Sequence, residues 1–189
     1  LLHWKSDVAL YSNQGGGRFA DATAQAGLKE VVGQGYSALF FDYDRDGRLD
    51  LLLTSHAPYE EAVRCLLQPE ARAGRGTPRL FHNQGEGSFE EITKQVGLDR
   101  SYGTLQALAH DFDRDGWSDL LLVNGGLEAY RLEPSVILRN VEGKELREWG
   151  CFPNPDRPSN LIGAAVADLN RDGRPEAYLA HNPLGHAVP

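Results

Sequence analysis

The chain has 189 residues and a formal net charge of −8, because 27 aspartate and glutamate residues outnumber 19 lysine and arginine residues. This acidic balance argues against a nucleic-acid partner, which usually meets a basic surface, and no apolar stretch reaches the roughly 18 residues of a membrane span. With 41% hydrophobic and 24% charged residues, the composition is that of folded globular protein. The chain starts at Leu1 and contains no methionine, so we expect a segment of a longer protein.

The first predicted element is a hairpin over residues 10–19. Its sequence places a strand-like segment before the turn Asn13-Gln-Gly-Gly-Gly, and glycines supply the positive φ angles that tight hairpins need. The signature returns over residues 80–89 and more faintly from Ile137. After the first two copies, the segments Gln25-Ala-Gly-Leu28 and Gln95-Val-Gly-Leu98 lead toward the next unit.

An acidic loop between apolar runs comes next. Asp42-Tyr-Asp-Arg-Asp-Gly-Arg-Leu-Asp50 follows an apolar run over residues 36–41 and precedes another over residues 51–53. Because these runs are nearly continuous, they predict strands that are buried on both faces. The pattern of run, loop and run recurs twice, with the later loops at Asp111-Phe-Asp-Arg-Asp-Gly-Trp-Ser-Asp119 and Asp168-Leu-Asn-Arg-Asp-Gly-Arg-Pro-Glu176.

The hairpin and the loop repeat in register. Each turn asparagine precedes the first residue of the following loop by 28 or 29 residues. The first complete repeat is longer than the second, and the additional residues fall over residues 58–78. We interpret this segment as a short helical insertion. The repeat boundaries are then approximately 1–34 (partial), 35–103, 104–160 and 161–189 (partial).

Repeated four-stranded sheets with two buried faces are typical of β-propeller blades. Each repeat has four predicted strands, two that flank the acidic loop and two that form the hairpin. The chain then holds two strands of one blade, two whole blades and two strands of another, which amount to about three blades. Because a closed propeller typically has at least four blades, we predict an all-β arc cut from a larger ring. Alanine stands four residues before each acidic loop and suits a crowded strand near a central axis; these are Ala38, Ala107 and Ala164.

Carboxylates at alternate loop positions predict a cation site. Side chains at positions 1, 3 and 5 point inward when the loop curls, and their repulsion requires a neutralising ion. Ca²⁺ suits them because it accepts six to eight oxygen ligands in flexible geometry. Position 7 would add a backbone carbonyl, and position 9 would close the cage. Three Ca²⁺ sites are expected, with the ligands Asp42, Asp44, Asp46, Arg48, Asp50, Asp111, Asp113, Asp115, Trp117, Asp119, Asp168, Asn170, Asp172, Arg174 and Glu176.

The loops differ from two other kinds of acidic loop. An EF-hand would need a glutamate at position 12 and flanking helices, whereas position 12 is Leu53, Leu122 or Leu179 and the flanks are strand-like. A solvated acidic turn without a metal is disfavoured by three copies in register. The position-4 arginines are expected to face solvent. Cys65 and Cys151 fit either two thiols or one disulfide.

These motifs resemble the FG-GAP/VCBS repeats of integrin α-subunit propellers and many bacterial surface proteins. Residues 51–58 match the segment after the metal loop, with His-Ala-Pro where Gly-Ala-Pro usually stands. Residues 80–98 are similar to proteins of the ASPIC/UnbV and cartilage acidic protein type. The third loop departs from the pattern with Asn170 and Glu176. The resemblance covers nearly the whole chain outside the insertion and residues 151–160, and it implies a propeller with calcium loops.

The leading functional hypothesis is a non-enzymatic, calcium-stabilised module that binds a protein or glycan ligand or serves adhesion. The alternative is part of a catalytic propeller, such as a polysaccharide lyase or hydrolase, with its active site outside this segment. An enzyme of that kind should show a cleft with converging titratable groups beyond the metal loops. Because extracellular calcium modules bind at about 10⁻⁴ to 10⁻³ M, the expected location is the cell surface, the periplasm or the medium.

Overall fold

The computed structural model describes residues 8–28, 35–56, 58, 60–61, 64, 67–68, 76–98, 100–125, 133–152 and 160–181. These residues form twelve strands in four antiparallel sheets, which hold two, four, four and two strands in chain order. The strands are β1 (Tyr11–Gly15), β2 (Arg18–Asp21), β3 (Gly35–Phe41), β4 (Asp50–Ser55), β5 (Arg79–Gly85), β6 (Ser88–Glu91), β7 (Thr104–His110), β8 (Asp119–Asn124), β9 (Ser135–Val141), β10 (Glu145–Phe152), β11 (Leu161–Ala167) and β12 (Glu176–His181).

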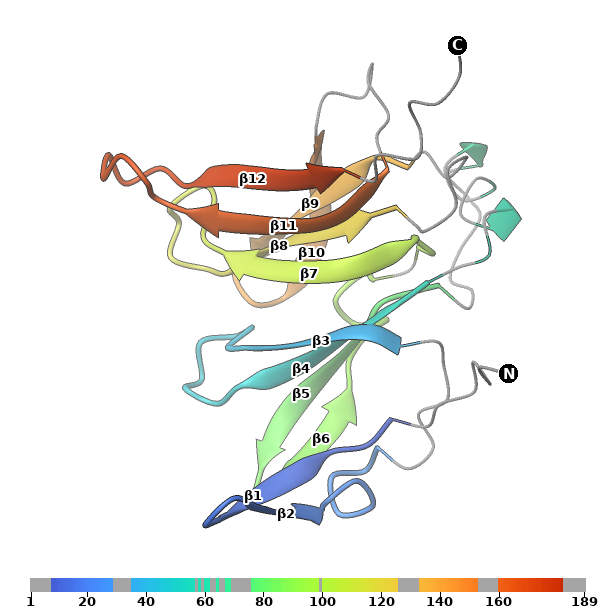
Figure 1. Ribbon diagram of the computed structural model, residues 1–189, viewed down its shortest axis with the longest axis vertical. Helices are drawn as coiled ribbons and strands as arrows, with labels where there is room; N and C mark the ends of the chain where they lie inside the picture. The colour runs from blue at the N-terminus through green and yellow to red at the C-terminus, as the bar shows by residue number, and fades with distance from the viewer. Residues whose placement is uncertain are drawn as a thin grey trace.

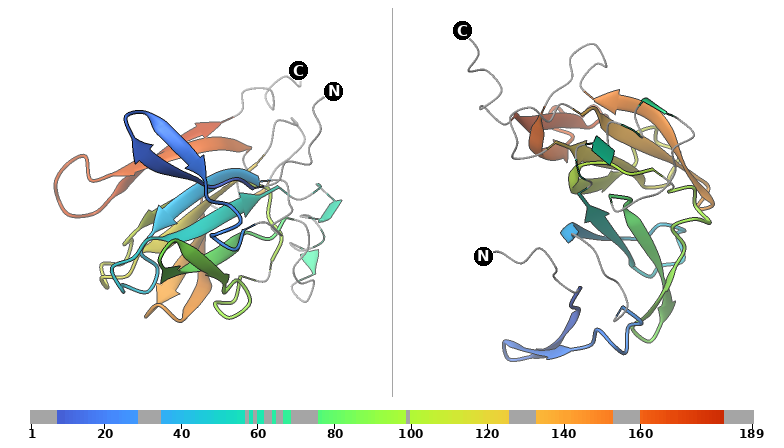
Figure 2. Two further views of the ribbon diagram at one scale, coloured as in Figure 1. Left: turned by 90° about the horizontal axis from the view of Figure 1, so that it is seen from below. Right: turned by 90° about the vertical axis from the view of Figure 1, so that its right-hand side faces the viewer.

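The sheets follow one another as propeller blades. Within each complete blade the strands pair in sequence order, β3-β4-β5-β6 and β7-β8-β9-β10. The first strands of successive sheets lie together, with β3 beside β7 and β7 beside β11. Figure 1 shows the sheets stacked from β1–β2 at one end to β11–β12 at the other, and the right-hand view of Figure 2 shows that they follow a curve. The prediction of an all-β propeller arc with this strand count is confirmed.

The interfaces between blades carry the hydrophobic core. Leu51 and Phe81 face the first sheet, whereas Leu52 on the alternate face packs with Leu120 and Leu122 of the third. Every residue of β8 is buried, as are five of the six residues of β4. The continuous apolar runs therefore mark strands that lie between two neighbouring blades, as the sequence predicts.

The repeated alanines do not share one environment. Ala107 is buried and Ala164 is half-buried, but Ala38 is exposed. Ala38 faces the first sheet, and the described residues of that sheet form only the two outer strands β1 and β2. The prediction of a crowded strand therefore holds for Ala107, whereas Ala38 is exposed because the described residues include no inner strand of the first sheet to cover it.

The turns that follow the first two hairpins tie one blade to the next. The backbone N–H of Phe89, in the second blade, donates to the carbonyl of Ala26 at 3.1 Å. The N–H of Leu146, in the third blade, donates to the carbonyl of Val96 at 2.7 Å. Gly27 has a φ of +76°, and a Cβ there would lie 3.3 Å from the Phe89 carbonyl oxygen. Glycine is required at this turn by both its conformation and its close approach.

A threonine in each of these turns gives a matched test of how the turn is held to its own blade. The Thr93 hydroxyl accepts the N–H of Leu80 at 3.1 Å, and both residues are buried. Thr93→Val should cost about 1 to 3 kcal/mol of unfolding free energy, because it leaves a buried donor unsatisfied. The Thr23 hydroxyl accepts the N–H of Leu10 at 2.9 Å where both residues are half-buried. Thr23→Val should cost less in urea unfolding, and equal losses would contradict this account.

The insertion and the cysteines are described only in part. Glu60, Glu61, Arg64 and Leu67 have helical conformation, and the N–H of Gln68 donates to the carbonyl of Arg64 at 2.9 Å. Most other residues of the insertion, including Cys65, lie outside the described residues. Cys151 is a free, half-buried thiol. Within the described part of the chain, no helix has both the length and the apolar character that crossing a membrane requires.

Candidate metal centre

Each acidic loop folds around its own carboxylates. The N–H of the position-6 glycine donates to the position-1 carboxylate at 3.1, 2.9 and 2.8 Å, in the pairs Gly47 with Asp42, Gly116 with Asp111 and Gly173 with Asp168. The N–H of position 7 donates to the position-5 carboxylate at 2.8, 2.9 and 2.7 Å, in the pairs Arg48 with Asp46, Trp117 with Asp115 and Arg174 with Asp172. The three loops therefore share one conformation.

Position 4 adopts an unfavourable backbone conformation in every loop. Arg45, Arg114 and Arg171 have φ angles of 60°, 63° and 61°, a region that costs a residue with a Cβ roughly 1 to 2 kcal/mol. Three repetitions of the same strained residue indicate that the tight curl is required. Strain of this kind is concentrated at binding and catalytic sites.

The curl brings the side chains at loop positions 1, 3 and 5 together in the first two loops. Carboxylate oxygens of Asp42, Asp44 and Asp46 all lie within 4.8 Å of one another, and those of Asp111, Asp113 and Asp115 do the same. These two clusters could hold a metal ion. The third loop substitutes the Asn170 amide for one carboxylate, although the N–H of Asp172 still donates to Asp168 at 3.2 Å and to Asn170 at 2.8 Å.

One buried carboxylate oxygen in the first loop lacks a protein partner. In each of the three loops, one oxygen of the position-5 carboxylate contacts a nitrogen donor. The Oδ1 atom of Asp42 is buried and has no hydrogen-bond partner among the described residues. The outer oxygen of position 5 contacts a nitrogen donor in every loop; the donors are Arg48, Arg139 and Asn170. An unpartnered buried carboxylate oxygen fits a site that is completed by a cation.

Position 9 connects the loop to the third strand of its blade. The fully buried Asp50 carboxylate accepts the N–H of Tyr43 and the N–H of Asn83, both at 2.8 Å. The equally buried Asp119 accepts the N–H of Phe112 at 3.0 Å and that of Asn140 at 2.8 Å. Glu176 accepts one described amide, from Leu169 at 2.7 Å. Position 9 is therefore a structural link as well as an expected ligand.

The buried position-9 carboxylates give a pH dependence. Burial raises the pKa of Asp50 and Asp119 above its ordinary value, and nearby aspartates raise it further, against the opposing effect of the backbone amides. In chelator, these two carboxyl groups hold more protons in the folded chain than in the unfolded chain above about pH 4, so their contribution to the free energy of unfolding should fall as pH rises above that value. Urea unfolding at several pH values tests this, and Asp119→Asn should flatten the slope. The lowered pKa values of Glu91 and Asp115 act in the opposite direction, so the change of slope caused by Asp119→Asn is the test, and an unchanged slope would contradict the prediction.

A family model for the FG-GAP-like repeat matches residues 2–53 and 71–122, which together make up more than half of the chain. The chain belongs to the FG-GAP-like repeat family. Each matched FG-GAP-like repeat spans the outer hairpin of one blade and the first two strands of the next, β1–β4 and β5–β8. Strands β9–β12 follow the same order around the third loop. No curated protein matches the chain.

The residue before each turn asparagine differs between the FG-GAP-like repeats, and the repeat pattern assigns it no role. His82 Nδ1 lies 3.1 Å from Asp50 Oδ1 and 3.5 Å from Asp44 Oδ2. At the equivalent position, Arg139 Nη2 lies 3.1 Å from Asp115 and its Nε lies 2.5 Å from Asp113, the latter as an ion pair without hydrogen-bond geometry. The third strand of its blade therefore presents a histidine to the first loop and an arginine to the second, although Arg48 brings a guanidinium to Asp46 within the first loop itself. These contacts arise because β4 pairs with β5 and β8 pairs with β9, which brings the residue before each turn asparagine beside the acidic loop of its own blade.

The position-4 arginines connect successive FG-GAP-like loops. The Arg45 guanidinium lies 5.3 Å from the centre of the Trp117 ring in the next loop. Arg114 Nη2 contacts the carbonyl of Asp172 in the loop after that, at 3.5 Å. These side chains are exposed, as predicted, but they also bridge neighbouring loops. The three loops therefore form one contiguous edge of the arc.

Proposed function

We propose that the chain is a non-enzymatic, calcium-stabilised β-propeller module that binds a protein or glycan ligand outside the cell. The observation that carries the proposal is the convergence of oxygen donors at positions 1, 3 and 5 of successive loops, with a buried Asp42 oxygen left unpartnered. FG-GAP repeats are generally structural modules without catalytic function, and they are typical of extracellular or secreted proteins.

The donor set favours Ca²⁺ over other common cations. The side chains at positions 1, 3, 5 and 9 offer carboxylate or amide oxygens, and the position-7 backbone can add a carbonyl. Hard oxygen donors in an irregular loop suit calcium, whereas magnesium demands near-ideal octahedral geometry. The ion would supply charge neutralisation and no catalysis. The residues that would hold it are the fifteen expected from the sequence, five in each loop.

Calcium titration tests the metal assignment. Calorimetry on chelator-treated protein should give three calcium ions per chain, and calcium should raise the melting temperature because it binds the folded state. At ten times the dissociation constant, each site adds about 1.4 kcal/mol of stability. Magnesium at the same concentration is the matched control and should stabilise less. Fewer than two ions per chain, or an unmoved melting temperature, would refute the assignment.

The ligand assignment needs a separate experiment. Calcium-loaded chain should bind members of a glycan array or a panel of extracellular proteins, and chelated chain should lose that binding because the loops no longer hold one shape. Equal binding by chelated chain would show that the metal loops do not shape the ligand surface. No binding to either panel would count against a recognition module.

A further inference from the structure

The third strand of the first complete blade brings a nitrogen donor to the acidic loop. His82 Nδ1, on β5, lies 3.1 Å from Asp50 Oδ1 and 3.5 Å from Asp44 Oδ2. Ligand atoms of these three residues all lie within 4.8 Å of one another, and the group could hold a metal ion. This group, called the His82 cluster below, differs in chemistry from the clusters of carboxylates at loop positions 1, 3 and 5.

The spacing of the His82 cluster fits one small divalent ion. Zinc lies roughly 2.0 to 2.2 Å from nitrogen and oxygen ligands in tetrahedral sites, so that neighbouring ligand atoms are about 3.4 Å apart. The two distances from Nδ1, 3.1 and 3.5 Å, bracket this separation. A single ion can therefore reach all three side chains, and water can supply the fourth ligand.

Backbone amides hold both carboxylates of the His82 cluster in place. Asp50 accepts the N–H groups of Tyr43 and Asn83, both at 2.8 Å. Asp44 Oδ1 accepts the N–H of Asp46 at 3.3 Å, which leaves Oδ2 to face the cluster. Carboxylates that bind metals in proteins are themselves hydrogen-bonded in this way, and the hydrogen bonds fix their orientation. The cluster is therefore oriented before any ion arrives.

The His82 cluster combines a buried charge with an open side. The Asp50 side chain is 0% exposed, whereas those of His82 and Asp44 are 19% and 31% exposed, so an ion can enter from solvent. Arg48, the arginine of the same loop, pairs with Asp46, which lies outside the cluster. Two carboxylates and a neutral imidazole leave two negative charges, and one divalent ion neutralises them. Such compensation matters most for the buried member.

A carboxylate next to the His82 cluster gives independent support for a cation. Asp44 also belongs to the group that it forms with Asp42 and Asp46, whose ligand atoms lie within 4.8 Å of one another. The Oδ1 atom of Asp42 is buried and has no hydrogen-bond partner among the described residues. An ion bound to Asp44 would lie near enough to offset this uncompensated charge.

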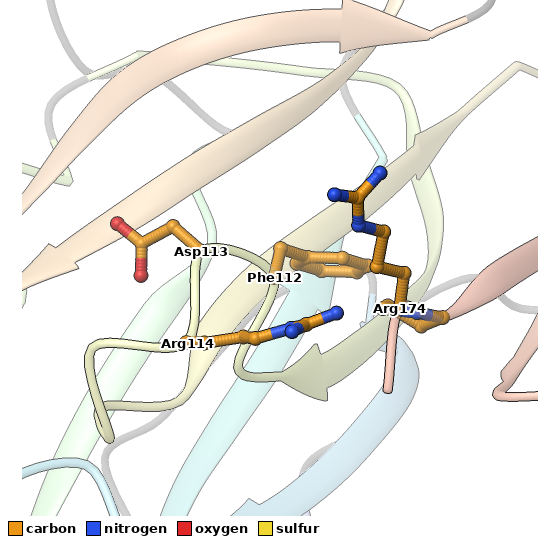
Figure 3. A pocket seen from close by; sticks show the side chains of 5 residues that line it. Phe112, Asp113, Arg114 and Arg174 are labelled. Atoms are coloured by element: carbon orange, nitrogen blue, oxygen red, sulfur yellow. The ribbon is translucent and has the colours of Figure 1, made fainter. Parts of the chain in front are cut away.

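The second complete blade has an arginine in the same place. β5 pairs with β4, and β9 with β8, in the same register, so His82 and Arg139 occupy equivalent positions. Arg139 Nε lies 2.5 Å from the position-3 carboxylate, at Asp113 Oδ2. Figure 3 shows this carboxylate pointing away from the pocket that Arg114 helps to line. The position-3 carboxylate thus meets a fixed cation in the second blade, whereas in the first blade it meets an imidazole, which can bind a metal.

The donor set selects a transition ion rather than calcium. Calcium takes oxygen ligands, whereas an imidazole nitrogen suits zinc and its neighbours in the first transition series. We propose that His82, Asp44 and Asp50 form a transition-metal site, for which Zn²⁺ is the expected ion. Because Asp44 and Asp50 are also expected calcium ligands, the two ions would compete for the first loop. The proposal goes beyond the calcium-module function and does not require that any loop binds calcium.

Exchanging the two equivalent side chains tests the site. Chelator-treated chain is titrated with Zn²⁺ alone by calorimetry. His82→Arg copies the second blade and should weaken the tightest zinc-binding event at least about tenfold, because even the outer-shell partners of metal ligands contribute that much. Arg139→His should add a second event, because the second loop has the same carboxylates at positions 3 and 9. His110→Gln is the matched control and should change neither event, since His110 lies on β7 against the Phe112 ring.

Circular dichroism should show these variants folded, because the side chains of His82 and Arg139 are 19% and 44% exposed. The gain of a zinc-binding event in Arg139→His cannot arise from misfolding of the first blade. No zinc binding by the unmodified chain, or equal binding by His82→Arg, would overturn the proposal.

Competition between ions separates this proposal from the calcium-module function. Chain loaded with radioactive calcium is dialysed with and without Zn²⁺. Zinc should release one calcium ion from the unmodified chain and none from His82→Arg, because His82 is not among the expected calcium ligands. If the chain binds zinc through His82 but never binds calcium, the calcium function fails and the zinc site stands. If calcium binds and zinc releases none of it, the zinc site fails and the calcium function stands.

Discussion

Asp119→Ala should lower the free energy of unfolding by about 2 to 5 kcal/mol even in chelator, because it leaves the buried backbone amide of Asn140 and the part-buried amide of Phe112 without their acceptor. Each unsatisfied buried donor costs about 1 to 3 kcal/mol. The loss does not require a bound metal, since both hydrogen bonds are made by the protein alone. The same substitution should also remove one calcium-binding event from the titration.

Glu176→Ala is the matched control for this experiment. Glu176 has the same loop position, but its partner amide belongs to the exposed Leu169, where water can replace the carboxylate. Its cost should stay below about 1 kcal/mol in chelator, as for most exposed substitutions. Urea unfolding of the two variants measures the difference. Losses below about 1 kcal/mol for both variants in chelator would show that the amide contacts of Asp119 do not stabilise the fold and that position 9 serves only as a metal ligand.

The fold was predictable because its signals are local and repeated. Continuous apolar runs marked β4 and β8 as doubly buried strands, and the turn asparagines located the outer hairpins. The exposure of Ala38 was not predictable from its own neighbours, because it depends on which strands of another sheet cover β3. Sequence periodicity reports the faces of one strand and not the extent of the adjacent blade.

The site was predictable at the level of its loops and not of its surroundings. Alternating carboxylates indicated clusters at positions 1, 3 and 5, and those at Asp42 and Asp111 form as expected. The contacts of His82 and Arg139 with the loops were missed, because the residue before the turn asparagine varies between repeats and is 32 and 26 residues distant from Asp50 and Asp113 in the chain. Strand pairing, and not spacing, brings them to the carboxylates.

The third loop should bind calcium most weakly and release it first on chelation. It carries one carboxylate fewer, since Asn170 replaces an aspartate, and calcium affinity in such loops depends on ligand charge and rigidity. Glu176 must fold back an extra methylene to reach the same centre, at a cost in side-chain entropy. Asp168, Asn170 and Asp172 are exposed, whereas Asp111 and Asp113 are half-buried. The smaller repulsion in the empty third loop acts in the opposite direction and does not outweigh these three effects.

Alanine substitutions rank the loops. Asp113→Ala should cost more calcium-dependent stability than Asn170→Ala, because it removes a charged ligand whereas Asn170→Ala removes a neutral one. The first and second loops each place a guanidinium on the position-5 carboxylate, Arg48 on Asp46 and Arg139 on Asp115, so the expected order separates the third loop from the other two. Calorimetric titration of Asp44→Ala, Asp113→Ala and Asn170→Ala assigns each binding event to its loop. If Asn170→Ala abolishes the tightest event, the order is wrong, and rigidity of the loop rather than its charge count governs affinity in this arc.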